Sequence, residues 1–210
     1  VTDSAGAFIA TVLAPPCEPV SHSIVASDSG GSVTVTFTIS RSIALSPSLG
    51  PVGTLALVTG SGYLASNTII ITFDGSAVPT TPATVISDFY GGFVASFNVP
   101  SVSPGAHTVR GIDNVGGSAT ATFTVTPSIS LSSSSGRGGT SITVTGTGFA
   151  SSNTVAIRFD GNLLLNFPTD LSGGFSATVT IPLAPAGGHV ISATDGLGST
   201  ASASFSVTPS

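Results

Sequence analysis

The sequence has 210 residues with a formal net charge of −5, and charged residues make up only 6% of it. Four arginines and no lysine are too few for the basic surface that binds nucleic acid, and no run of 18 apolar residues exists to insert into a membrane. Glutamate occurs once, whereas Val, Ile, Thr and Phe are abundant, so the composition favours strands over helices.

Residues 1–42 match only half of a repeat that then occurs twice in full. The segment IALSPSLGPVGTLALVTG at 43–60 aligns with ISLSSSSGRGGTSITVTG at 129–146, and the alignment continues through both copies. We therefore predict two complete domains, at 43–127 and 128–210, after an incomplete one. The sequence holds 2.5 repeats, and we expect the first unit to be completed by another chain or by sequence outside this one.

Each repeat consists of short segments in which apolar and polar residues alternate, as in half-buried strands. The incomplete unit has three such segments, at 8–15, 22–28 and 35–39. Asp-Gly pairs at 74–75 and 160–161 favour tight hairpin turns. Each complete repeat, with about seven strands and frequent turn signals, is predicted to be an all-β Greek-key sandwich of two sheets. Its core should contain the inward-facing phenylalanines, which are Phe73, Phe93, Phe97, Phe123, Phe159, Phe175 and Phe205.

Several motifs recur in the same order in both complete repeats: I-x-L-S, G-x-G-[FY], F-D-G, D-x-x-G-x-F and G-x-H. This combination resembles the immunoglobulin-like repeats of archaeal and bacterial cell-surface proteins, such as S-layer proteins, adhesin stalks and extracellular filaments. The resemblance covers the whole chain and implies tandem immunoglobulin-like sandwiches in an extracellular or cell-surface protein. It implies no catalytic residues, and we expect neither a metal nor a cofactor.

Three histidines occupy the same position in the three units, each followed six residues later by an aspartate. The pairs suggest a catalytic dyad or a metal site, but six residues of strand span about 20 Å, so the two side chains of a pair cannot meet. We expect each histidine to bond a neighbouring loop at a sheet corner and each aspartate to accept turn N–H groups. The residues are His22, His107 and His189, with Asp28, Asp113 and Asp195.

Asp74 and Asp160 precede the glycines of the predicted hairpin turns. They are single carboxylates, whereas calcium prefers several together, so a turn role is favoured over calcium ligation. Cys17 has no partner in the chain and is either a lone thiol or half of an intermolecular disulfide. No Asn-x-Ser/Thr motif occurs, while the abundant Ser and Thr residues either carry O-glycans or simply favour exposed strands.

Apolar residues on the predicted outer faces and on the uncovered half unit form a candidate subunit interface. Scattered exposed aliphatic residues are also normal on a protein surface. The half unit, however, would expose its inward side chains and open strand edges unless strands from a neighbour complete it. The candidate interface residues are Phe8, Ile9, Leu13, Ile24, Val25, Phe37, Leu55 and Leu57.

These observations favour a non-enzymatic, structural subunit of an extracellular filament, sheath or S-layer, in which copies of the chain assemble head to tail by β-strand complementation. Short links between successive units predict a semi-rigid rod. The alternative is a stalk or carbohydrate-binding repeat region of a larger cell-surface adhesin or enzyme. Sugar binding favours exposed aromatic side chains, but tryptophan is absent and Tyr63 and Tyr90 are the only tyrosines.

Overall fold

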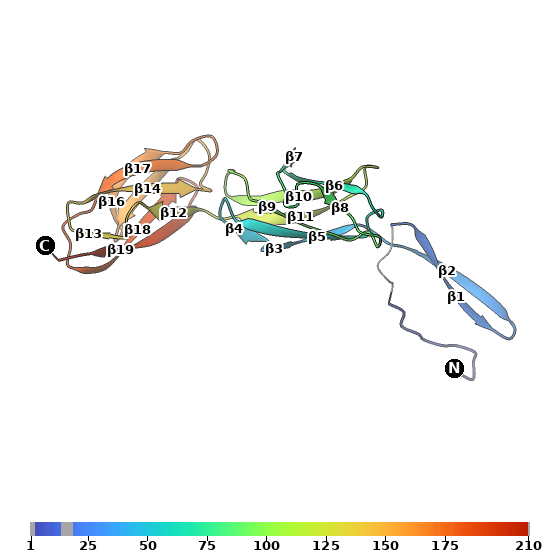
Figure 1. Ribbon diagram of the computed structural model, residues 1–210. Helices are drawn as coiled ribbons and strands as arrows, with labels where there is room; N and C mark the ends of the chain where they lie inside the picture. The colour runs from blue at the N-terminus through green and yellow to red at the C-terminus, as the bar shows by residue number, and fades with distance from the viewer. Residues whose placement is uncertain (1–2, 14–18, 210) are drawn as a thin grey trace.

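The computed structural model describes residues 3–13 and 19–209, and the regular secondary structure in these ranges is entirely β-strand. A two-stranded hairpin is followed by two β-sandwiches, and Figure 1 shows the three parts in a row along the chain. None of the described residues forms a helix long and apolar enough to cross a membrane. The hairpin strands are β1 (Ser21–Asp28) and β2 (Gly31–Thr38).

The first sandwich, β3–β11, consists of two sheets that face each other. One has three strands in the order β3-β5-β9. The other has the order β4-β11-β10-β6-β7, and β8 also pairs with β6 in it. After β3 the chain crosses between the sheets, so that β4 pairs in parallel with β11. This connectivity is that of an immunoglobulin-like sandwich. The strands are β3 (Ser42–Ser46), β4 (Leu49–Gly50), β5 (Leu55–Ser61), β6 (Thr68–Phe73), β7 (Ser76–Ala77), β8 (Val85–Ile86), β9 (Phe93–Asn98), β10 (Gly105–Asp113) and β11 (Ser118–Val125).

The second sandwich, β12–β19, repeats this arrangement with sheets of order β12-β14-β17 and β13-β19-β18-β15-β16. Its β16 runs along the whole of β15, whereas β7 and β8 of the first sandwich are short pieces at the same edge. The first repeat carries extra residues at this point, which interrupt the edge strand. The strands are β12 (Ser128–Leu131), β13 (Ser135–Gly136), β14 (Ser141–Thr147), β15 (Thr154–Phe159), β16 (Asn162–Pro168), β17 (Phe175–Thr180), β18 (Gly187–Asp195) and β19 (Thr200–Val207).

Each sandwich encloses its own hydrophobic core between its two sheets. Burial alternates along the strands, as in β17, where every second side chain from Phe175 is buried. The seven phenylalanines expected in the cores are all buried, with exposed fractions of 7% or less. The expected all-β fold of tandem immunoglobulin-like sandwiches is therefore confirmed.

The incomplete unit is a hairpin to which no other strand of the described residues pairs. A third strand was predicted over 8–15. This prediction is wrong for 8–13, which have no strand structure, while 14 and 15 lie outside the described residues. The reason is the lack of a pairing partner. The matching strand of the first sandwich, β9, forms its backbone hydrogen bonds with β5, and the incomplete unit has no counterpart of β5.

Phe123 provides a test of the core of the first sandwich. Phe123→Ala removes a ring with 0% exposure and should lower the free energy of unfolding of this sandwich by about 3–5 kcal/mol. Both tyrosines, Tyr63 and Tyr90, lie in this sandwich, so tyrosine fluorescence during urea titration follows its unfolding alone. The matched control is Phe89→Ala, because Phe89 is 79% exposed and its loss should cost less than about 0.5 kcal/mol. Equal losses for the two variants would contradict the assigned core.

Candidate functional site

A histidine and an aspartate meet at the same corner of both sandwiches, but they are not the residues six apart in the sequence. In the second sandwich, Nδ1 of His189 on β18 lies 2.6 Å from Oδ2 of Asp160, in the turn after β15. The Nε2 atom of the same ring lies 2.9 Å from the carbonyl oxygen of Pro185. In the first sandwich, His107 on β10 makes the same contacts with Asp74 and with a loop carbonyl.

Each corner aspartate ties its turn to the neighbouring strand. Asp74 and Asp160 adopt left-handed φ angles of 47° and 46°, and each is followed by a glycine that is also left-handed. The Oδ1 atom of Asp74 accepts a hydrogen bond from the N–H of Thr108, at 2.9 Å. Burial opposes ionisation of Asp74, but the hydrogen bonds from His107 and Thr108 outweigh it and lower the pKa of this carboxyl group.

The geometry around His189 favours its protonated form. Its two ring nitrogens face a carboxylate and a carbonyl oxygen, both of which accept hydrogen bonds, so the protonated ring can donate to both. The ring stacks on Phe159 with centroids 4.9 Å apart and planes inclined by 22°, which suits a cation. The bonds to Asp160 and to the Pro185 carbonyl raise the pKa of His189 above its ordinary value. The bonds from His189 and from the N–H of Val190 lower the pKa of Asp160.

These hydrogen bonds hold the corner of the sheet together. They also occupy the histidine and aspartate side chains, which are the groups that could otherwise take part in a reaction. Within the described part of the chain there is no group of three or more His, Cys, Asp or Glu residues that could hold a metal ion. A hollow of about 450 Å³ beside the joint of the two sandwiches contains one titratable group, Asp170. The carboxylate of Asp170 already accepts hydrogen bonds from the N–H of Gly174 and from Ser172, which lower its pKa.

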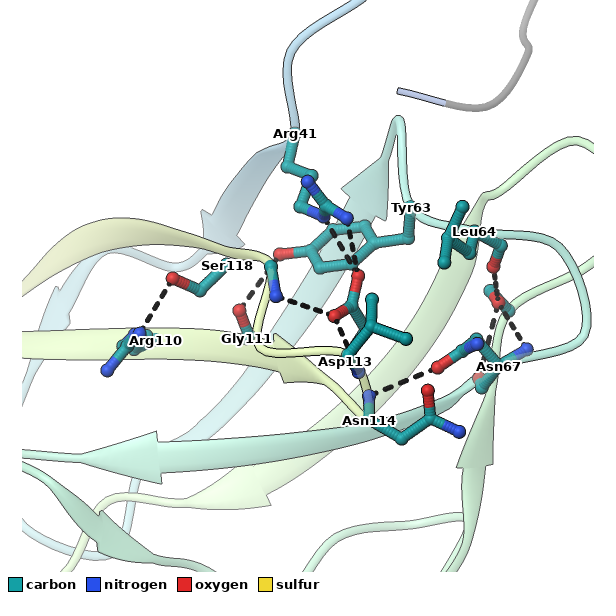
Figure 2. A network of polar contacts seen from close by, with 12 residues as sticks. Arg41, Tyr63, Leu64, Asn67, Arg110, Gly111, Asp113, Asn114 and Ser118 are labelled. Carbon is teal, nitrogen blue, oxygen red and sulfur yellow. Dashed lines mark hydrogen bonds and ion pairs between the residues drawn. The ribbon is translucent and has the colours of Figure 1, made fainter. Parts of the chain in front are cut away.

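A buried carboxylate lies at the far end of β10 from the His107 corner, and Figure 2 shows its partners. Oδ1 of Asp113 accepts hydrogen bonds from the N–H groups of Val115 and Gly117 in the turn after β10. Its Oδ2 accepts two from Arg41, from Nε at 2.9 Å and from Nη2 at 2.8 Å. The Asp113 side chain has 0% exposure, so Arg41 supplies the countercharge that a buried carboxylate needs. Arg41 belongs to the link between the hairpin and β3, and it therefore fastens this link to the first sandwich.

The second sandwich satisfies its equivalent carboxylate without an arginine. Arg41 lies against Gly117, where a Cβ atom would overlap its guanidinium group. The second repeat has Pro127 and Ser199 at these two positions, and Asp195 takes its hydrogen bonds from backbone N–H groups instead. Burial opposes ionisation of Asp195, but these hydrogen bonds outweigh it and lower its pKa. Arg41 was not identified from the sequence as a partner of the buried carboxylate. The signal that could have found it is that Arg41 and Gly117 occur together in the first repeat and are both replaced in the second.

The two tyrosines differ in their access to a ligand. Tyr63 is fully buried, its hydroxyl group donates to the carbonyl of Gly111 at 3.2 Å, and burial raises its pKa to about 12. Tyr90 is 58% exposed and lies edge to face with the exposed Phe89, with ring centroids 5.4 Å apart. The second sandwich has leucine and serine at these two positions, so the aromatic pair occurs in one unit alone.

The hairpin has one apolar and one hydroxyl-rich face. On the apolar face the register places Ile24 opposite Val35 and Ala26 opposite Val33, while the other face is mostly Ser and Thr. His22 lies at the end of the apolar face, 5.6 Å from the ring of Phe37. Asp28 accepts hydrogen bonds from two N–H groups of the turn between β1 and β2.

Most of the residues expected to form a subunit interface are accessible. Phe37 is partly buried, and the others are exposed, which are Phe8, Ile9, Leu13, Ile24, Val25, Leu55 and Leu57. The expected role of these side chains in a subunit interface stays a prediction. Cys17, the expected half of an intermolecular disulfide, lies outside the described residues.

The sequence of the second sandwich is similar to that of a known domain family. The IPT/TIG domain model matches residues 124–208, which include all of β12–β19. The second sandwich is therefore similar to IPT/TIG domains. The match supports the expected relation to immunoglobulin-like repeats, and no curated protein sequence matches the chain.

Solved structures with some similarity to this chain include parts of two adhesion proteins and of intimin. The adhesin InvE of Yersinia pseudotuberculosis is 12% identical over 81% of this chain and 58% of that one, with a TM-score of 0.35. A tetra-tandem repeat from the extending region of a large adhesion protein is 15% identical over 88% of this chain and 56% of that one, also with a TM-score of 0.35. The D0-D1 domain of intimin is 12% identical over 80% of this chain and 97% of that one, with a TM-score of 0.29. The chain spans little more than half the length of the first two.

The ion pair between His189 and Asp160 should stabilise the second sandwich fully over a middle range of pH. Its contribution should fall at higher and at lower pH. The pKa of His189 is raised from 6.5 in the folded state, so its contribution is complete below pH 6.5 and is lost as pH rises through the folded value. The pKa of Asp160 is lowered from 3.8, so its contribution is present above pH 3.8 and is lost as pH falls through the folded value. Asp160→Asn tolerates the left-handed backbone but removes the charge.

The stability difference between the natural chain and Asp160→Asn should therefore be largest between pH 3.8 and 6.5 and should shrink on either side. Urea unfolding followed by NMR signals of the second sandwich measures it. Asp170→Asn is the matched control, because Asp170 has a lowered pKa but its hydrogen-bond donors are Ser172 and Gly174, and its difference should stay constant above pH 6. A pH-independent difference for Asp160→Asn would rule out the ion pair.

Removing the arginine at the buried carboxylate should destabilise the first sandwich. Arg41→Ala leaves Oδ2 of Asp113 without either side-chain donor and should cost about 1.5–3 kcal/mol in the free energy of unfolding. The control is Arg110→Ala, because Arg110 donates at the surface to Ser118 alone and should cost less than about 0.5 kcal/mol. Tyrosine fluorescence during urea titration measures both, and similar losses would show that the buried pair has no special weight.

Proposed function

We propose that this chain is a stalk segment of an extracellular or cell-surface protein, in which tandem immunoglobulin-like domains hold other parts of the molecule at a distance. The role is mechanical and non-enzymatic. The observation that carries the proposal is that the chain enters both sandwiches through joints of the same construction. A stalk needs such joints, because a chain of domains with loose links would coil and would not act as a spacer.

The joint between the sandwiches is short and is held from both sides. Two residues, Thr126 and Pro127, connect β11 to β12. The N–H of Thr126 donates to the carbonyl of Gly50 in the first sandwich, at 3.0 Å. Its own carbonyl oxygen lies against Gly148 of the second sandwich, where a Cβ atom would approach it to 2.9 Å. Gly148 has a φ of 70°, so both its conformation and the space beside it favour glycine.

The joint between the hairpin and the first sandwich shares the second of these contacts. Three residues, 39–41, connect β2 to β3. The carbonyl oxygen of Ser40 lies against Gly62, which has a φ of 74° and where a Cβ atom would approach that oxygen to 2.6 Å. Arg41 adds the ion pair with Asp113. The two joints thus share the contact between linker carbonyl and glycine and differ in the residue that follows it.

The sequence resemblance to repeats of surface proteins and the surface rich in Ser and Thr support a location outside the cell, where O-glycans could be added. A filament, sheath or S-layer built from copies of this chain, the role first expected from the sequence, would need contacts between chains. The joints that support the proposal lie within one chain, and they favour the stalk. A carbohydrate-binding role would depend on Phe89 and Tyr90, whose pair is not repeated in the second sandwich.

The joint can be tested by comparing two glycines of the second sandwich with the same kind of backbone. Gly148→Ala should broaden the distribution of interdomain distances in small-angle X-ray scattering, because the new Cβ pushes against the Thr126 carbonyl. Gly161→Ala is the matched control, since Gly161 has a φ of 80° but nothing within 4 Å of the added Cβ. Its scattering profile should stay that of the natural chain. A natural chain that already scatters as a flexible pair of domains would argue against a stalk.

A further inference from the structure

The apolar face of the hairpin β1–β2 is uncovered, although the same face is buried in both complete units. Ile24 is 42% exposed and Val35 is 63% exposed. The sequence repeat aligns Ile24 with Val109 and Phe37 with Phe123, and both of these counterparts have 0% exposure in the first sandwich. A two-stranded hairpin is marginally stable in water by itself, so it gains from a further strand that pairs with its open edge and extends its apolar face.

The complete units show which element occupies the edge of the matching strand. In the first sandwich the outer edge of β10 pairs with β6, with Val109 opposite Phe73 and Gly111 opposite Ile71. The second sandwich repeats this pairing between β18 and β15. The hairpin strand β1 aligns with β10 residue by residue, but its outer edge pairs with no strand among the described residues. The strand that is lacking is therefore one of the β6 and β15 type.

We infer that the hairpin is a docking site for an extended strand from another polypeptide chain, with alternating apolar residues that end in Phe-Asp-Gly. By the register of the complete units, this strand runs antiparallel to β1 with its phenylalanine beside Ile24 and the second residue before it beside Ala26. Its aspartate faces the N–H of Ser23, as Asp74 faces Thr108 in the first sandwich. Asp28 is the one acidic residue of the hairpin, so the site contains no cluster of like charges to repel the strand.

The described residues contain no free strand of this type, because the suitable strands are already paired. β6 and β15 each lie in the interior of a sheet and pair on both edges. The segment from Phe8 to Leu13 corresponds to β9, which belongs to the opposite sheet and does not pair with β10. This inference goes beyond the stalk proposal and does not depend on it, because a stalk segment needs no binding site at its hairpin.

The test uses a synthetic peptide with the sequence of residues 153–161, NTVAIRFDG, labelled at its N-terminus. Arg158 keeps this peptide more soluble than the matching segment of the first sandwich. Fluorescence anisotropy with the whole chain should show saturable binding with one peptide per chain. Hydrogen exchange should show new protection in the amides of β1, with no change in either sandwich.

Two variants with the same chemical change on opposite faces of β1 provide the control. Ile24→Ser removes an apolar side chain from the docking face and should weaken peptide binding at least about tenfold. Val25→Ser makes a similar change on the other face, where the register places Arg158 of the peptide, and should weaken binding much less than Ile24→Ser. A peptide with Phe159→Ser should bind no better than the natural peptide binds to Ile24→Ser. Tyrosine fluorescence on urea titration should show the first sandwich unchanged in both chain variants.

Several results would overturn the inference. Absence of peptide binding, or equal weakening by Ile24→Ser and Val25→Ser, would exclude the proposed face. Protection of β1 in the free chain together with residues 8–13 would show that the chain covers its own hairpin. A concentration-dependent dimer that is lost in Ile24→Ser would show that two hairpins cover each other, which would replace the proposed strand with a second copy of the same face.

Discussion

The structure depends on the need to cover one apolar face of each strand pair. In both sandwiches the pair β10–β11 or β18–β19 has an inner face that contains Phe123 or Phe205, and the three-stranded sheet on the other side of the core closes it off from water. Hydrophobic burial of this kind provides most of the stability of a small β-domain, since a sheet with one exposed apolar face gains little on folding. The hairpin β1–β2 has the same face without the cover.

Polar groups at the ends of the strands determine how the covered units are held together. The corner pairs, His107 with Asp74 and His189 with Asp160, fasten one end of the larger sheet in each sandwich. At the other end, Asp113 accepts hydrogen bonds from Arg41 of the linker, whereas Asp195 accepts them from backbone N–H groups. The two repeats thus stabilise an equivalent buried carboxylate with different hydrogen-bond donors. In the first repeat, the arginine that donates also attaches the preceding linker to the sandwich.

These two features have different consequences for function. Sandwiches with closed cores and short, supported joints are suited to spacing, because each link is in contact with the domain that follows it. An amphipathic hairpin with an open strand edge is suited to association, because backbone N–H and C=O groups and apolar side chains are available together. The chain therefore combines two sandwiches with closed cores and a hairpin, β1–β2, whose exposed apolar face corresponds to a face that is buried in the sandwiches.

The sequence by itself determined the repeat, the strand class and the core, because a period of two in Phe93–Asn98 or Phe175–Thr180 reports burial on one face wherever the strand lies. It also showed that residues six apart, such as His107 and Asp113, cannot meet on one strand. It did not identify Asp74 as the partner of His107, nor Arg41 as the partner of Asp113, because these contacts join residues 33 and 72 positions apart and depend on which strands become neighbours in the fold. Residues 8–13 illustrate the same limit. Their alternation is that of a strand, but a strand needs a neighbour for its backbone hydrogen bonds, and only the tertiary structure decides whether one is present.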